Sequence, residues 1–310
     1  MRRLTLLIAC VLWLLLPASG SAASPEIGVV RDFGSNLTPN CPHPEGIAVD
    51  ARGNVYASSF TPTGTICVLD STGALTDVIS IGSPLIGMLF EESQGLYVID
   101  FGHASLLLVN PATHASRTIA SGPLGGPNAL AQDRHKNLYV SDSFGGRIWK
   151  IAPGGTTTVW KQDARLTTAG FPPFGANGVA FDLGEANLYV ANTGDDRVLR
   201  IPVNPDGSAG AVSVFATGID GADGIAFDVR GNLYVCANQA DEIAVISPAG
   251  SRIATYRGTG AAALHFPASL VFKGRDLFVT NLAFDHSFNS LPDSKVSVLT
   301  VPFPGAPLRP

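Results

Sequence analysis

The sequence predicts an all-β protein, a six-bladed β-propeller of four-stranded antiparallel blades that its N-terminal strand closes. The chain of 310 residues has 34 glycines, 22 prolines and only 15% charged residues, which is typical of many short strands joined by tight turns. A Leu-Tyr-Val pattern recurs six times in varied form, at spacings of 41 to 50 residues. Each repeat carries signals for four strands, and repeats of this length and content are typical of propeller blades.

The first 23 residues are expected to lie outside the propeller. A pair of arginines precedes an apolar run over residues 4–16, and small residues follow that run. This order is typical of a secretory signal peptide, here with cleavage after Ala22 or Ala23. We therefore predict a signal peptide over residues 1–23, which is removed, and a single propeller domain over residues 24–310. The mature protein is expected to be secreted or periplasmic and to have no contact with a membrane.

Three cysteines remain in the mature chain, namely Cys41, Cys67 and Cys236. Because the number is odd, at least one thiol is free or pairs between chains. An oxidising compartment would allow a bridge between Cys41 and Cys67, and burial of both as small apolar side chains is the alternative. Cys10 raises the possibility of a lipoprotein signal, but too little apolar sequence precedes it.

The six copies of the repeated pattern predict the second strand of each blade. They lie at residues 54–57, 95–98, 137–140, 187–190, 232–235 and 276–279. An apolar segment about eight residues upstream of each copy is expected to form the innermost strand, and two further strands follow. Residues 28–33 resemble a fourth strand without the preceding three, whereas the sixth repeat has no fourth strand. The N-terminal strand is therefore expected to complete blade six, which leaves no open edge in the ring.

Topology predicts which loops share a face of the propeller. In a four-stranded meander, two kinds of loop lie on the same face: the loops that lead into the first strand and the loops that join the second strand to the third. The long segments 161–174 and 282–294 both fall on this face, and long loops on a rigid scaffold often carry function. His103 and His286 lie there and are second-line candidates for acid–base chemistry, with an ordinary loop role as the alternative.

The positions just before each innermost apolar run are expected to converge at the mouth of the central channel. They are Glu45, Ile86, Asn128, Asn177, Asp223 and Ala268. Four of them offer a side-chain oxygen, and two carboxylates with two amides suit a hard cation. We therefore predict that Glu45, Asn128, Asn177 and Asp223 bind Ca²⁺ or another divalent cation. The alternative is that these residues, mostly followed by glycine, serve as turn residues before a strand.

In these residues the mature chain resembles the gluconolactonase/regucalcin (senescence marker protein) family of calcium-dependent six-bladed propellers, with NHL-type repeats. Glu45 matches the family's first-blade glutamate, Asn128 and Asn177 match its third- and fourth-blade asparagines, and Asp223 matches its fifth-blade aspartate. The resemblance implies that Asp223 binds the metal and also acts as general base or nucleophile. Ala129 follows Asn128 where the family often has an acidic residue, which argues against a sugar-acid lactone as substrate.

These features predict a secreted calcium-dependent hydrolase of lactones or related esters, whose cation polarises the carbonyl. The alternative is a non-catalytic binding propeller similar to NHL-repeat proteins. Phe171, Phe174 and Phe284 are expected to form an apolar rim that favours a less polar substrate, or to pack beneath the loops. A formal net charge of −5 without a basic stripe argues against binding of nucleic acid. We expect a monomer that acts on a small molecule.

Overall fold

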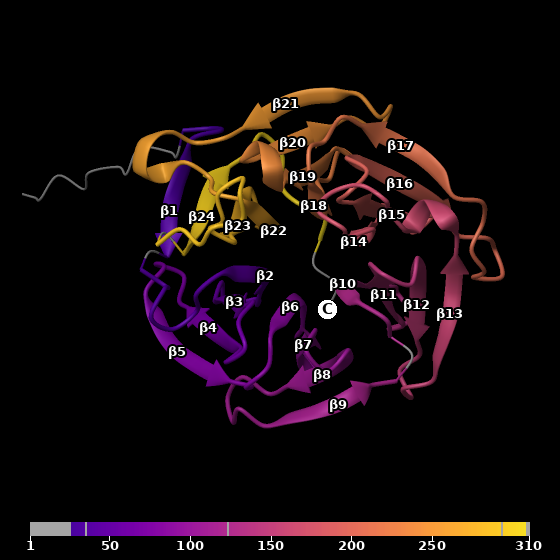
Figure 1. Cartoon of the computed structure of the whole chain (residues 1–310), viewed down its shortest axis with the longest axis horizontal. Helices are drawn as coiled ribbons and strands as arrows, with labels where there is room; N and C mark the ends of the chain where they lie inside the picture. Colours follow the sequence, from indigo (N-terminus) through magenta and orange to yellow (C-terminus); the bar gives the residue numbers. More distant parts are fainter. Residues whose placement is uncertain (1–25, 35, 123, 293, 308–310) are drawn as a thin grey trace, which may run out of the picture.

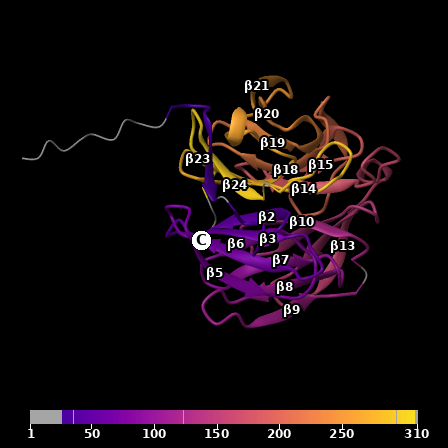
Figure 2. The same ribbon diagram turned by 60° about the vertical axis from the view of Figure 1, so that its left-hand side comes forward.

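The computed structural model describes residues 26–34, 36–122, 124–292 and 294–307, so the predicted signal peptide lies outside the described residues. Within these ranges the strands form six four-stranded sheets around a central channel (Figure 1), which confirms the predicted propeller. The innermost strands are β2 (Pro44–Val49), β6 (Leu85–Glu91), β10 (Pro127–Gln132), β14 (Ala176–Phe181), β18 (Ala222–Phe227) and β22 (Pro267–Lys273). The outer strands stay at the rim when the molecule is turned (Figure 2), as seen for β5 (Leu75–Ser80), β9 (Ser116–Ala120), β13 (Thr157–Gln162) and β21 (Arg252–Tyr256). None of the described helices is long and apolar enough to cross a membrane.

The blades are numbered in chain order. Blade 1 comprises β2 (Pro44–Val49), β3 (Val55–Ser59), β4 (Thr65–Leu69) and β5 (Leu75–Ser80). Blade 2 comprises β6 (Leu85–Glu91), β7 (Gly95–Asp100), β8 (Ser105–Val109) and β9 (Ser116–Ala120). Blade 3 comprises β10 (Pro127–Gln132), β11 (Leu138–Asp142), β12 (Arg147–Ile151) and β13 (Thr157–Gln162). Blade 4 comprises β14 (Ala176–Phe181), β15 (Asn187–Asn192), β16 (Arg197–Pro202) and β17 (Ser213–Thr217).

Blade 5 comprises β18 (Ala222–Phe227), β19 (Leu233–Ala237), β20 (Glu242–Ile246) and β21 (Arg252–Tyr256). Blade 6 comprises β22 (Pro267–Lys273), β23 (Asp276–Asn281), β24 (Lys295–Thr300) and β1 (Val30–Gly34). β1 pairs antiparallel with β24, so the N-terminal strand closes the ring as predicted. Short 3-10 turns occur in three connections: η1 (Ala164–Leu166), η2 (Asn238–Ala240) and η3 (Gly260–Ala262).

Every innermost strand contains the same irregularity of register near its start. In β14, for example, Ala176 pairs with Asn192 and the next ladder partner is Val179, so the two residues between them form a bulge. A bulge changes the direction in which a side chain points and strengthens the local twist. The residues predicted for the metal site occupy these bulges, so they lie within strands and do not serve as turn residues.

The glycine that follows most of these residues is required by close contact between blades. A Cβ atom on Gly178 would lie 2.3 Å from the backbone oxygen of Asp223, and one on Gly224 would lie 2.6 Å from that of Ala268. The innermost strands therefore approach one another more closely than any side chain permits. This approach brings the site residues of neighbouring blades together around the channel.

The structure decides whether Cys41 and Cys67 form a disulfide, which the sequence left open. Cys41 and Cys67 form a disulfide with a Cα–Cα distance of 6.1 Å, whereas Cys236 is a buried free thiol. The bridge links the segment that leads into β2 to β4, in the same blade. It therefore restrains the backbone four residues before Glu45.

Candidate metal centre

A cavity of about 130 Å³ lies at the end of the channel that faces the long loops. Its floor consists of Glu45, Asn128, Asn177, Thr193, Asp223 and Asn238. Its walls are mainly phenylalanines from the connections that lead into the innermost strands and from those that follow the second strands. The structure thus brings all four predicted ligand residues to one cavity, on the predicted face. Ile86 also lines it, whereas Ala268 is buried beside Phe266 and Leu282.

Four buried side-chain oxygens in this cavity have no hydrogen-bond partner. They are Glu45 Oε2, Asn128 Oδ1, Asp223 Oδ1 and Asn238 Oδ1. A buried polar atom without a partner costs about 1–3 kcal/mol, and native proteins contain few of them. Four acceptors without a donor at one place are the arrangement that a bound cation would satisfy. Carboxylate and amide oxygens are the ligands that Ca²⁺ prefers, so the residues present fit the predicted group.

The amide groups are fixed by donor bonds on their nitrogen side. Asn128 Nδ2 donates to Ser143 Oγ at 3.2 Å, and Asn177 Nδ2 donates to Thr193 Oγ1 at 2.9 Å. Asn238 Nδ2 donates to Asp223 Oδ2 at 2.9 Å. These bonds use the NH₂ groups, so the carbonyl oxygens of Asn128 and Asn238 remain as acceptors.

The hydroxyls that receive these bonds also connect adjacent blades. Ser143 Oγ donates to the backbone oxygen of Ala176 at 2.7 Å, which joins blade 3 to blade 4. Thr193 Oγ1 donates to the backbone oxygen of Ala222 at 2.8 Å, which joins blade 4 to blade 5. Asn128 and Asn177 are therefore each oriented by a hydroxyl that is itself tied to the next innermost strand, and these bonds position both amides before any ligand binds.

The two carboxyl groups on the floor disfavour each other's charge. Burial raises the pKa of Glu45 well above its ordinary value, and the negative charge of Asp223 raises it further. Burial also raises the pKa of Asp223 to about 7, although the side chains of Asn238 and Asn177 lower it. No lysine, arginine or histidine is found among the described residues that line the cavity. A divalent cation would supply the missing positive charge.

The donor set has only two carboxylates. The described part of the chain contains no group of three or more histidine, cysteine, aspartate or glutamate side chains that could hold a metal ion. The amide oxygens are therefore essential to the candidate centre. A larger cavity of about 490 Å³ at the opposite end of the channel has Asp182 as its only carboxylate and does not offer this donor set.

The two candidate histidines lie outside the described lining of the cavity. His103 Nδ1 contacts Asp100 Oδ2 at 2.9 Å, and His286 Nε2 contacts Asp241 Oδ2 at 3.0 Å. Both imidazoles are largely exposed. Each links a loop to an aspartate, and neither meets the floor residues.

Asn238 is a floor residue that the sequence analysis did not single out. It directly follows β19, just as Ser143 follows β11 and Thr193 follows β15. The common feature is a polar residue immediately after the second strand, and this position contacts the site residue of the same blade. Attention to that position in each repeat would have found Asn238 from the sequence.

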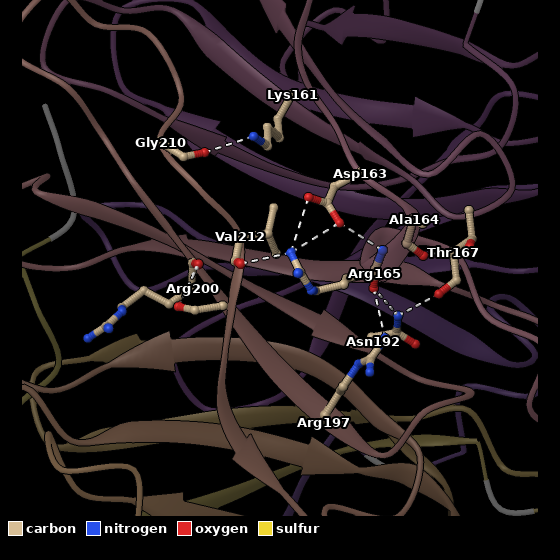
Figure 3. Close-up of polar contacts among 11 residues, drawn as sticks. Lys161, Asp163, Ala164, Arg165, Thr167, Asn192, Arg197, Arg200, Gly210 and Val212 are labelled. Carbon is tan, nitrogen blue, oxygen red and sulfur yellow. Dashed lines mark hydrogen bonds and ion pairs between the residues drawn. The ribbon is translucent and has the colours of Figure 1, made fainter.

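Of the three predicted rim residues, Phe174 and Phe284 line the cavity, whereas Phe171 is 64% exposed and packs edge-on against Phe288. The loop that carries Phe174 is anchored to blade 4 (Figure 3). Asn192 Nδ2 donates to the backbone oxygens of Arg165 and Thr167, both at 2.9 Å. These bonds hold the base of the loop, so Phe174 is presented to the cavity by an ordered segment.

Comparison with known proteins found a family model that matches part of the chain. The sequence model of the SMP-30/gluconolactonase/LRE-like region matches residues 153–283. This segment includes Asn177 and Asp223 of the candidate centre and confirms the resemblance to the gluconolactonase/regucalcin family. No curated protein matches the chain in sequence.

Solved structures of similar fold carry related names. A putative gluconolactonase has a TM-score of 0.72 at 20% identity, over 90% of this chain and 94% of that one. A gluconolactonase from Xanthomonas campestris has a TM-score of 0.70 at 16% identity, over 88% and 89%. The calcium-binding protein regucalcin from Agrobacterium tumefaciens has a TM-score of 0.67 at 18% identity, over 89% and 95%. At these identities the likeness establishes the fold alone.

Proposed function

We propose that this protein is a hydrolase of lactones or related esters. It depends on a divalent cation bound at the mouth of the channel, and Ca²⁺ is the first candidate. The observation that carries the proposal is the convergence of four unpartnered buried oxygens, from two carboxylates and two amides, on one cavity. The match to the SMP-30/gluconolactonase/LRE-like region supports a lactonase-type reaction.

Glu45, Asn128, Asn177 and Asp223 would hold the cation. When bound, it would supply Lewis-acid chemistry that polarises the carbonyl group of the substrate. The floor contributes by holding its oxygens in place before the substrate arrives, so little reorganisation is needed during the reaction.

Asp223 acts as the general base in this proposal. Its Oδ2 is held by Asn238 Nδ2, whereas its Oδ1 has no hydrogen-bond partner among the described residues. Oδ1 takes a proton from a water molecule, and the water oxygen attacks the carbonyl carbon. The bond between that carbon and the ester oxygen then breaks, and the departing alkoxide receives the proton from Asp223. For a lactone, the product is a hydroxy acid.

The test combines cation binding with activity. Calorimetric titration with Ca²⁺ should show one site in the wild type. Asp223→Ala should bind Ca²⁺ at least a hundredfold more weakly. The control is Asp206→Ala, which alters an exposed aspartate on a turn and should not change the affinity. Hydrolysis of a panel of lactones and esters should require the cation and disappear in Asp223→Ala. Absence of cation binding in the wild type would overturn the proposal. Cation binding without cleavage of any ester would favour the non-catalytic binding propeller.

We also propose that the mature chain is exported and acts as a monomer on a small molecule. The disulfide between Cys41 and Cys67 supports export, because such bonds persist mainly in oxidising compartments. Fractionation of cells that express the whole chain should place the processed protein outside the cytoplasm. Light scattering after gel filtration should give the mass of one chain, and a dimer mass would contradict this part of the proposal.

A further inference from the structure

The walls of the candidate centre point to the class of substrate. We propose that the cavity takes lactones that bear a hydrocarbon chain and rejects lactones of sugar acids. This inference rests on the proposed lactonase function and specifies which substituent the lactone ring carries.

The walls above the polar floor are almost wholly apolar and aromatic. Six phenylalanines line them: Phe60, Phe101, Phe174, Phe266, Phe284 and Phe288. They form two groups of touching rings. Phe101 lies 5.6 Å from Phe60 and 6.5 Å from Phe174, measured between ring centroids. Phe266 lies 6.0 Å from Phe284 and 5.4 Å from Phe288. Such walls favour the binding of a hydrocarbon chain, because burial removes its apolar surface from water.

The described lining of the cavity offers few donors to a hydroxyl-rich substrate. One N–H of each NH₂ group in Asn128, Asn177 and Asn238 is already bonded, and the Thr193 hydroxyl donates to a backbone oxygen. The described lining contains no lysine, arginine or histidine. The unpartnered floor oxygens are acceptors, and the proposed cation takes them. Hydroxyls of a sugar lactone would therefore lose their water partners against phenylalanine and regain few hydrogen bonds in return.

Floor and walls together select an amphiphilic molecule. The ester group is drawn to the floor, where the oxygens and Asp223 lie, and the substituent is left against the rings. An alkyl substituent packs favourably against the rings, whereas a polyhydroxylated substituent would place its hydroxyls against apolar walls.

The test compares lactones of one ring size in the Ca²⁺-loaded wild type. We expect kcat/KM for δ-decalactone to exceed that for unsubstituted δ-valerolactone at least tenfold, and that for glucono-δ-lactone at least a hundredfold. Phe174→Ser should reduce the preference for δ-decalactone over δ-valerolactone at least threefold. Phe303→Ser, which alters a phenylalanine outside the described lining of the cavity, should not change it. Melting temperatures of both variants show whether they fold, and the wild-type series decides the question without them.

A second measurement separates this inference from the lactonase proposal. Binding of 3-pentylcyclohexanone, which has the six-membered ring and pentyl chain of δ-decalactone but no ester to cleave, is followed by calorimetry. If no lactone is cleaved but the ketone binds and Phe174→Ser weakens it, the lactonase proposal fails and the hydrocarbon preference stands. If glucono-δ-lactone is cleaved as well as δ-decalactone, the preference is wrong and the lactonase proposal stands. If neither cleavage nor ketone binding occurs, both are wrong.

Discussion

Asp223 and Asn238 show how single residues prepare the floor of the cavity. Asn238 donates to Asp223 Oδ2, and Asp223 Oδ1 has no hydrogen-bond partner among the described residues. Asn238 also contributes an unpartnered oxygen of its own. Asn238 therefore orients a predicted ligand residue and also offers an acceptor itself. Residues that orient ligands commonly affect metal affinity roughly 10- to 100-fold.

Replacing Asn238 by alanine is expected to weaken Ca²⁺ binding about tenfold, because Asp223 loses the donor that fixes it. Calorimetric titration measures the change. Asn204→Ala is the matched control, since Asn204 bonds to Ser208 on an exposed turn. Equal affinity in wild type and Asn238→Ala would show that Asp223 is held by other contacts.

The carboxyl pair predicts how stability depends on pH in the protein without a bound cation. The pKa of Asp223 rises from its ordinary value of 3.8 to about 7 on folding, so the folded state holds this proton more tightly than the unfolded chain does. The resulting stabilisation is fully present below the ordinary pKa and is lost as the pH rises through about 7. The melting temperature in a chelator should therefore fall between pH 4 and pH 7, and fall less in Asp223→Asn.

Added Ca²⁺ should reverse this trend, because the cation binds deprotonated carboxylates. Its effect on the melting temperature is expected to be larger at pH 8 than at pH 5. A larger effect at the lower pH would contradict the assignment of the two carboxyl groups as ligands.

At the scale of the element, the bulge near the start of each innermost strand is the device that forms the site. It places the site residue and, in most blades, a glycine between two ladder partners. The glycine lets the next strand approach, and the residue before it turns toward the channel. Substitution of that glycine should therefore lower the free energy of unfolding and weaken Ca²⁺ binding.

Gly178→Ala is expected to lower the free energy of unfolding by about 1–3 kcal/mol, because its Cβ would lie 2.3 Å from the backbone oxygen of Asp223. It should also weaken Ca²⁺ binding. Gly184→Ala is the control, since nothing lies within 4 Å of a Cβ there. Denaturant unfolding of both variants tests the prediction, and equal stability would mean that the strands can move apart freely.

The disulfide gives a second prediction at this scale. The bond between Cys41 and Cys67 spans 26 residues of sequence, and chain entropy predicts a contribution of about 3.5 kcal/mol to stability. The double variant Cys41→Ser/Cys67→Ser should lose that amount in denaturant unfolding. Cys236→Ser breaks no disulfide, because Cys236 is a buried free thiol. Its effect on stability therefore reports only the packing of that side chain. No loss in the double variant would show that the bridge does not restrain the unfolded chain.

For the whole molecule, the sequence was sufficient to predict the ring. The six repeats define the blades, and the unpaired segment near residue 30 correctly predicts closure through β1. The convergence of Glu45, Asn128, Asn177 and Asp223 follows from the same repeat, because equivalent positions of a propeller meet at its axis. Their function as ligands stays a prediction.

Other features depend on contacts that no repeat encodes. The sequence left the pairing of Cys41 and Cys67 open, because separation along the chain does not determine the distance between two residues in space. It also misjudged Phe171, since the conformation of a long loop decides which of its rings faces inward. Asn238 was overlooked because the residue at its position differs from blade to blade.

The most direct measurement is a crystal structure of the protein grown with Ca²⁺. We predict one strong peak of electron density among Glu45, Asn128, Asn177 and Asp223, at roughly 2.3–2.6 Å from their oxygens, with waters completing the coordination. A structure at millimolar Ca²⁺ with no ion there, or with these oxygens satisfied by water alone, would contradict the metal site.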